Sequence, residues 1–132
     1  MKSDDGWYLT LFHLTGVSGE RPSQSKENKD KPPVLLCHGA GDDAVNWASV
    51  GVLGPSFPLQ LVDNGYDVWM NNDRGKFYSN RNERDGDWTL KERWDWSWAD
   101  MAQSDIPAVI KHVLKETGKP KLTVFGYSQG SA

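Results

Sequence analysis

The residues best suited to chemistry are a serine and two glycines near the end of the sequence, in the pattern Gly126-Tyr127-Ser128-Gln129-Gly130. They come directly after the apolar run Leu122-Thr123-Val124-Phe125, which is typical of a β-strand. A strand that ends in Gly-x-Ser-x-Gly predicts a sharp strand-to-helix turn, in which the serine backbone is strained and its Oγ projects above the sheet edge. The glycines leave room for neighbouring chain. The chemistry that this arrangement indicates is nucleophilic attack by the Ser128 hydroxyl.

The pattern by itself also fits a plain strand followed by a Gly-Ser turn, because both residue types are common. In the catalytic interpretation, the backbone N–H of Gln129 lies at the start of the next helix and points toward the substrate oxygen. The choice between the two interpretations depends on the elements that must position the serine.

Another apolar run, Val34-Leu35-Leu36-Cys37, reads as a buried parallel strand because it is continuous and preceded by prolines. It ends in the small-residue turn His38-Gly39-Ala40-Gly41, at the end of a strand where ligands bind in open α/β sheets. In α/β-hydrolases the second oxyanion donor comes from the loop after such a strand, which here indicates the backbone N–H of Ala40. An ordinary strand-to-loop turn would have the same composition.

The remaining segments predict an alternation of strands and helices. Strands are expected over residues 7–14 and 66–71, a short helix over 58–65, and loops over 16–31, 42–54 and 76–93. The clearest helix is expected over 99–117, where one apolar stripe contains Ile106, Val109, Ile110, Val113 and Leu114. Pro107 should kink this helix or mark a second start, and Gly118 should end it. This order predicts an α/β fold with a mostly parallel sheet and flanking helices.

Composition and charge exclude several classes of function. The chain has 132 residues, a length that fits a single domain able to bury a core. Its net charge is −3 without a basic block, so nucleic-acid binding is not expected. No apolar run reaches the ~18 residues of a membrane span, and residues 1–6 lack the apolar core of a signal peptide. The chain has a single cysteine, so no internal disulfide is expected. No second cysteine or paired histidine stands at the spacing of metal ligands, and we expect no metal or cofactor.

The three histidines all precede Ser128 and lie in elements that do not suit a catalytic base. His13 is expected on a surface or edge strand, and His112 on the solvent side of its helix. His38 is expected to brace its loop by hydrogen bonding rather than to move protons. Cys37 is interpreted as a small buried apolar residue.

Two further features have a structural and a functional interpretation. Arg74 could pair with a carboxylate inside the domain or reach a substrate, and the structural role is favoured. The aromatic segment 94–98 contains Trp94, Trp96 and Trp98 and could line a lipid or sugar site. Core packing at the entry to a helix, with Ser97 as its N-cap, is favoured there.

Several motifs in the same order resemble the acid lipases, the group of lysosomal acid lipase, gastric lipase and their relatives within the α/β-hydrolase fold. The match runs along nearly the whole chain. It includes the segments 5–9 (Asp-Gly-Trp-Tyr-Leu), 33–39 (Pro-Val-Leu-Leu-Cys-His-Gly), 61–69 with 72–75 (Asn-Asp-Arg-Gly), 97–102 with 105–108, and 126–130.

The resemblance implies hydrolysis of neutral lipid esters through an acyl-serine intermediate. Ser128 would be the nucleophile, and the amides of Ala40 and Gln129 would stabilise the oxyanion. A histidine and an acidic residue are also required, and in α/β-hydrolases both follow the serine. We therefore expect residues 1–132 to be a partial domain that lacks the cap and the C-terminal half of the enzyme. Such a piece should show little or no turnover alone. The family suggests a lysosomal or secreted site and contact with a lipid interface.

The chain departs from the family pattern near the expected acyl site. Tyr127 stands where the family usually has histidine, Ala40 where it usually has leucine, and Ser131 where it usually has threonine. The family's Arg-Ile-Pro segment in the first strand has no counterpart near His13. None of these changes removes a reacting group, although they leave the preferred ester open. The alternative function is a truncated, catalytically inactive module with a binding role.

Overall fold

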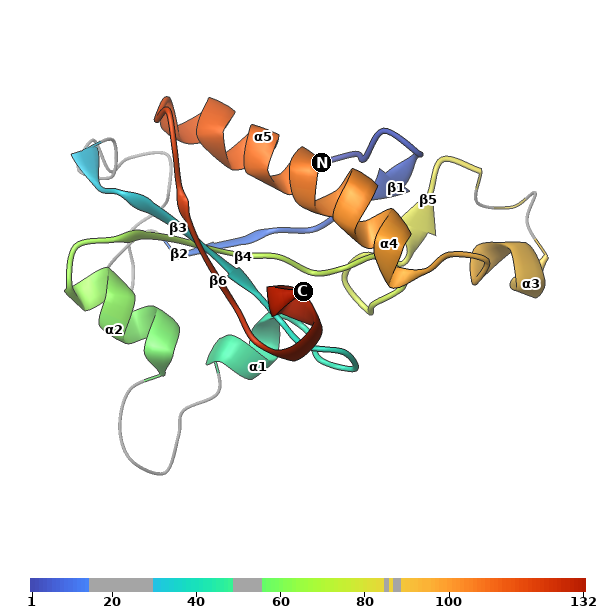
Figure 1. The fold of residues 1–132 in the computed structure, drawn as a ribbon, viewed down its shortest axis with the longest axis horizontal. Helices are drawn as coiled ribbons and strands as arrows, with labels where there is room; N and C mark the ends of the chain where they lie inside the picture. Colours follow the sequence, from blue (N-terminus) through green and yellow to red (C-terminus); the bar gives the residue numbers. More distant parts are fainter. Residues whose placement is uncertain (15–29, 49–55, 85, 87–88) are drawn as a thin grey trace.

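A computed structural model of the chain describes residues 1–14, 30–48, 56–84, 86 and 89–132. Its main sheet has four strands in the order β2 (Phe12–Leu14), β4 (Asp67–Met70), β3 (Pro33–Cys37) and β6 (Thr123–Gly126). β3 runs parallel to β4 on one side and to β6 on the other, whereas β2 is antiparallel to β4 (Figure 1). The expected α/β fold with a mostly parallel sheet is confirmed.

β3 is the centre of the core, and all five of its residues are buried. Because side chains alternate along a strand, Leu35 and Cys37 face one side of the sheet while Val34 and Leu36 face the other. A strand covered on both faces is apolar throughout, which is why this run is continuous rather than alternating.

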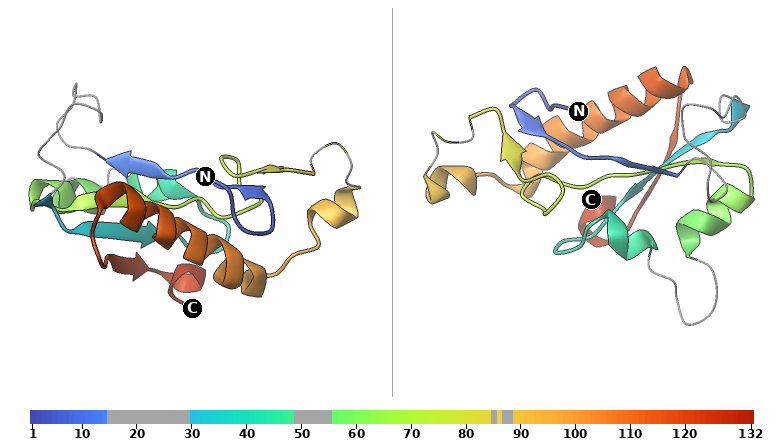
Figure 2. Two further views of the ribbon diagram at one scale, coloured as in Figure 1. Left: turned by 90° about the horizontal axis from the view of Figure 1, so that it is seen from above. Right: turned by 180° about the vertical axis from the view of Figure 1, so that it is seen from behind.

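Helices cover both faces of the sheet (Figure 2). On the Leu35 side lies α5 (Ile106–Thr117), which packs Val109 and Val113 into the core. On the Val34 side lie α1 (Ala44–Ala48) and α2 (Phe57–Asp63), the former through Ala44 and the latter through partly buried side chains.

The helix expected over 99–117 consists of three consecutive elements. α4 (Trp98–Asp100) is followed by the π-helical turn η3 (Met101–Asp105) and then by α5. Pro107 lies in the first turn of α5, so the proline coincides with the second start that was expected there. The backbone stays helical across this point, since Asp105 has a φ of −71° and a ψ of −54° and the Ile106 N–H donates to the Met101 carbonyl. Ser97 is the N-cap of α4 and shares a capping box with Asp100, and Gly118 ends α5 with a φ of 67°.

The single strand expected over 7–14 is wrong. β1 (Trp7–Tyr8) pairs with β5 (Arg81–Asn82) in a separate two-stranded sheet, and β2 joins the main sheet. The strand is interrupted because Thr10 is bonded elsewhere: its N–H donates to Ser79 Oγ and its hydroxyl to the Tyr78 carbonyl.

The expected loops contain short elements that periodicity did not reveal. α1 lies within the stretch predicted as a loop over 42–54, and β5 and α3 (Leu90–Arg93) lie within 76–93. Thr89 and Glu92 form a capping box that starts α3. Most of the loop predicted over 16–31 lies outside the described residues. In the part of the chain that the structure describes, no helix is long and apolar enough to cross a bilayer.

Candidate active site

β6 delivers Ser128 to a sharp turn at the carboxyl end of the sheet. Tyr127 is still extended, with a φ of −131°, whereas Ser128 has a φ of 53° and starts the 3₁₀ helix η4 (Ser128–Ser131). Ser128 is the one non-glycine residue with a positive φ among the residues described. A left-handed conformation costs an ordinary residue about 1–2 kcal/mol, so this backbone is strained in the way that the Gly-x-Ser-x-Gly pattern predicts.

The two flanking glycines make this turn sterically possible. A Cβ on Gly126 would lie 1.9 Å from the carbonyl oxygen of Gly130. A Cβ on Gly130 would lie 2.4 Å from the carbonyl oxygen of Cys37 and 2.6 Å from that of His38. The turn is therefore pressed against the end of β3, and any side chain at either glycine would force the two segments apart.

The loop after β3 is held in place by His38, whose side chain is fully buried. Its Nδ1 lies 2.9 Å from the Gly39 carbonyl oxygen, and its Nε2 lies 3.2 Å from the backbone nitrogen of Asp73. The two bonds are compatible in a neutral ring that donates from Nδ1 and accepts at Nε2. Both nitrogens are thus engaged with backbone, so the loop-bracing role expected for His38 fits the structure and a proton-transfer role does not.

The loop that carries Ala40 lies directly beside Ser128. A Cβ on Gly39 would stand 3.1 Å from Ser128 Cβ and 2.8 Å from Cε2 of Tyr127. The parallel register pairs Cys37 with Gly126, which brings the ends of β3 and β6 level. Ser128 and Ala40 are exposed, and Gln129 is half-buried. The three residues predicted for the site therefore gather at one edge of the sheet.

The other two histidines have partners away from this edge. His13 lies in β2, separated from β6 by two strands; its Nε2 is 2.5 Å from Asp67 Oδ1 and its ring stacks on Trp69. His112 on α5 makes an edge-on contact with the same tryptophan at 6.1 Å between ring centroids, so it is half-buried rather than solvent-facing as expected. None of the described histidines is thus placed to take a proton from Ser128.

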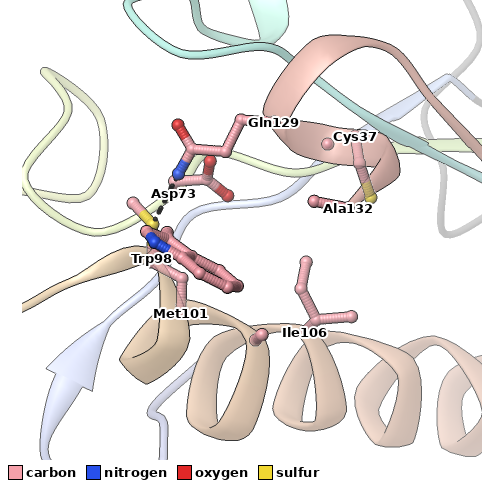
Figure 3. A pocket seen from close by; sticks show the side chains of 9 residues that line it. Cys37, Asp73, Trp98, Met101, Ile106, Gln129 and Ala132 are labelled. Atoms are coloured by element: carbon pink, nitrogen blue, oxygen red, sulfur yellow. Dashed lines mark hydrogen bonds between the residues drawn. The ribbon is translucent and has the colours of Figure 1, made fainter.

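A small cavity lies between the elbow and the start of the long helix (Figure 3). Cys37, Asp73 and Gln129 line it from the sheet side, and Met101 and other residues line it from the helix side. The Gln129 side-chain amide nitrogen is 3.1 Å from the Met101 sulfur, so this side chain reaches across the cavity toward the π-helical turn. Burial raises the pKa of Asp73, and burial together with the Asp73 charge raises the pKa of the Cys37 thiol to about 12.

Tyr127 and Asp42 form a contact at the site that sequence reasoning missed. The Tyr127 hydroxyl donates a hydrogen bond to Asp42 in the loop after β3. The two residues are 85 positions apart; Tyr127 occupies a variable position of the Gly-x-Ser-x-Gly motif, and Asp42 belongs to no motif that was singled out. No spacing in the sequence could have indicated this pair, because it depends on how the ends of two strands meet.

Arg74 has the structural role that was favoured. Its guanidinium is buried and binds Asp105 through Nε at 2.9 Å and Nη2 at 2.7 Å, and Asp5 through Nη1 at 2.6 Å. Burial alone would raise the pKa of the Asp5 carboxyl, but the bonds from Arg74 and Ser3 outweigh it and lower that pKa. The ion pairs join the N-terminal segment to the helical side of the domain.

The tryptophan segment is only partly core. Trp96 packs on the core and meets Trp7 edge-on, whereas Trp94 and Trp98 are 56% and 65% exposed. Core packing was therefore the wrong interpretation for these two side chains, which lie on either side of the turn between α3 and α4. In the described ranges, no three histidine, cysteine or acidic side chains come together as metal ligands would.

Comparison with known proteins identifies the family to which the chain is similar. Residues 32–132 match the family model described as "alpha/beta hydrolase fold". Among curated proteins, the chain is 38% identical to Lipase 1 of Drosophila melanogaster over 130 residues, or 97% of this chain and 26% of that protein. It is 40% identical to human Lipase member M over 134 residues, covering 98% of this chain and 29% of that protein.

A third relative is the human protein named lysosomal acid lipase/cholesteryl ester hydrolase, 34% identical over 99% of this chain and 31% of that protein. The chain thus spans less than a third of the length of these relatives. The acid-lipase resemblance seen in the motifs is confirmed along nearly all of its residues. The match to the family model covers far more than half of the sequence, and the chain belongs to the α/β-hydrolase fold family.

Proposed function

We propose that the chain is the nucleophile-bearing part of a serine hydrolase that cleaves lipid esters. The observation that carries the proposal is the left-handed Ser128 between two glycines that are pressed against the end of β3. A strained, exposed serine at the carboxyl end of a parallel strand can approach an ester carbonyl without rearrangement. Its Oγ would attack the carbonyl carbon and form an acyl-serine, which water then hydrolyses.

The developing oxyanion needs two preorganised donors. Gln129 follows the nucleophile at the head of η4, where amide groups have no partner within the helix. Ala40 lies one residue after Gly39, which is in contact with Ser128. The amides of Ala40 and Gln129 are the proposed pair, and losing one such donor typically lowers the rate by ~10²–10³.

The proton acceptor must come from outside these residues in this proposal. His13, His38 and His112 are each engaged with other groups, as described above. In α/β-hydrolases the acidic residue and the histidine follow the serine in sequence. Residues 1–132 are then a partial hydrolase domain, and they should turn over esters poorly by themselves.

The names of the relatives support a lipid ester as substrate, since all three are called lipases. Exposed apolar side chains at Phe77, Leu90, Trp94 and Trp98 would suit contact with a lipid interface. The second candidate function is a catalytically inactive module that binds a lipid or a partner. The engagement of all three histidines with other groups is the observation that favours it.

The test is hydrolysis of p-nitrophenyl butyrate by the longest natural polypeptide that contains these residues, compared with residues 1–132 alone. Ser128→Ala should lower the rate by about 10³-fold or more. Ser131→Ala, a change in the same short helix, is the matched control and should retain most activity. Hydrolysis that survives Ser128→Ala would contradict the acyl-serine proposal. A polypeptide without Ser128-dependent hydrolysis would support the binding module instead.

A further inference from the structure

Tyr127 connects the nucleophile turn to the loop after β3 at two points. Its backbone N–H donates to the Cys37 carbonyl at 3.4 Å, and its hydroxyl donates to Asp42 Oδ2. Its ring also lies against Gly39, where a Cβ would come within 2.8 Å of Cε2. One side chain therefore touches both ends of the four-residue segment from Gly39 to Asp42.

This segment is a tight turn. The Asp42 N–H donates to the Gly39 carbonyl at 3.2 Å, and Gly41 has a φ of 84°, as the third residue of a type II turn requires. Ala40 is the second residue of the turn. Its amide is thus placed between Gly39, which contacts Ser128, and Asp42, which is bonded to Tyr127.

Asp42 is itself held from the other side. Its Oδ1 accepts a hydrogen bond from the Asn46 side chain in α1, and Trp47 of the same helix meets the Tyr127 ring edge-on at 5.0 Å between centroids. The hydroxyl of Tyr127 therefore bonds the loop just before α1, and its ring contacts α1 itself. Tyr127 is 37% exposed, so no packing requirement of the core explains a tyrosine here.

We propose that the hydrogen bond from Tyr127 to Asp42 fixes the position of the Ala40 amide relative to Ser128, and that Tyr127 and Asp42 are positioning residues for ester hydrolysis. This inference rests on the proposed function. Neither side chain needs to touch the ester. Their effect is to keep the Ala40 amide within hydrogen-bond distance of the ester oxygen on which negative charge develops. Such a contact stabilises the transition state more than the bound substrate.

The experiment measures kcat and KM for p-nitrophenyl butyrate in the longest natural polypeptide that contains these residues. Tyr127→Phe and Asp42→Ala should each lower kcat about tenfold, part of the ~10²–10³ expected for complete loss of a donor, with KM changed less than about twofold. The double variant should lose no more than the worse single variant, because both changes remove the same bond. Asp42→Asn keeps an acceptor oxygen and should recover most of kcat.

Tyr66→Phe is the matched control. Tyr66 has the same exposed fraction, 37%, and directly precedes β4. It therefore lies at the amino ends of the parallel strands, whereas Ser128 lies at their carboxyl ends. It should leave kcat and KM unchanged. In the 132-residue chain, hydrogen exchange of the amides in residues 39–42 should accelerate in Tyr127→Phe and not in Tyr66→Phe.

The outcomes separate this inference from the function on which it rests. If Ser128→Ala abolishes hydrolysis while Tyr127→Phe behaves like Tyr66→Phe, the positioning role is overturned and the proposed function stands. Additive losses in the double variant, or a loss confined to KM, would also overturn it. If no hydrolysis depends on Ser128, the proposed function fails and the positioning role fails with it.

Discussion

Gly126 and Gly130 face each other across the turn at Ser128, so closely that a Cβ on the first would lie 1.9 Å from the carbonyl oxygen of the second. The same turn brings Gly130 against the carbonyl oxygens at the end of β3. The two glycines are therefore required by backbone contacts, which cannot move aside as flexible side chains can. The spacing of the two glycines in the sequence therefore follows from the close backbone contacts of the turn at Ser128.

Alanine at Gly126 or Gly130 should destabilise the chain by about 2–3 kcal/mol, because the clash is with backbone. Urea unfolding followed by circular dichroism measures the change. Gly65→Asn is the control: Gly65 has a φ of 85° with no atom within 4 Å of a Cβ, and asparagine tolerates this conformation. Equal losses at Gly126 and Gly65 would contradict the steric account.

Glycine at position 128 should give a more stable chain than alanine at the same position, by about 1 kcal/mol. Ser128 has a φ of 53°, where glycine is unstrained and alanine is strained. At Ser131, in the same helix and without a positive φ, the order should reverse because alanine is the better helix former. Thermal unfolding of the four variants checks the prediction, and a variant with alanine at position 128 that is at least as stable as the glycine variant would show that the turn is not strained.

Replacement of Arg74 by methionine should destabilise the chain by about 3–5 kcal/mol, because it leaves the buried Asp105 carboxylate without its cation. Arg74→Lys should recover only part of this loss, since lysine cannot bond both Asp105 and Asp5 in the same fork geometry. Lys2→Met, which removes the exposed pair with Glu83, should have no measurable effect. Denaturant unfolding at neutral pH measures all three. A large loss in Lys2→Met, or none in Arg74→Met, would contradict the prediction.

The Cys37 thiol should stay protonated and unreactive in the folded chain at pH 8, because its pKa is raised to about 12 by burial and by the Asp73 charge. An unfolded cysteine has a pKa near ~8.5, so the folded state keeps its proton while the unfolded state loses it. Stability should therefore fall as pH rises from about 9 toward 12. Cys37→Ala should flatten this slope. Pulsed alkylation with iodoacetamide, read by mass spectrometry, should label Cys37 only in denaturant, and rapid labelling of the native chain at pH 8 would refute the prediction.

Local patterns were sufficient for the central strand and for the nucleophile. The continuous apolar run at residues 34–37 predicts a strand buried on both faces, because a parallel strand covered by helices on both sides suits four neighbouring apolar residues well. The Gly-x-Ser-x-Gly spacing likewise predicts the turn at Ser128, since the clashes that demand glycine arise within a few residues of the serine and against one adjacent strand.

Patterns failed where a segment's hydrogen bonds are taken by distant residues. The run at 7–14 has strand composition throughout, yet Thr10 bonds to Ser79 and Tyr78, so the run divides between two sheets. α1, α3 and β5 are too short for periodicity to register. The tryptophans at 94 and 98 are exposed although their residue type favours burial, because only Trp96 reaches the core.

The sequence by itself determined that Ser128 is presented on a strained turn after a strand, that the sheet is mostly parallel, and that the chain resembles acid lipases. These properties depend on residues close together in the chain or on motifs that can be read one by one. Only the tertiary structure decided that Tyr127 is bonded to Asp42, that His38 joins its own loop to the loop after β4, and that Arg74 joins Asp5 to Asp105. The first two contacts join loops brought together by the parallel register of β3, β4 and β6, and that register is set by burial of whole strands rather than by any local spacing. The third joins the N-terminal segment to the end of the π-helical turn, which are 100 positions apart in the sequence.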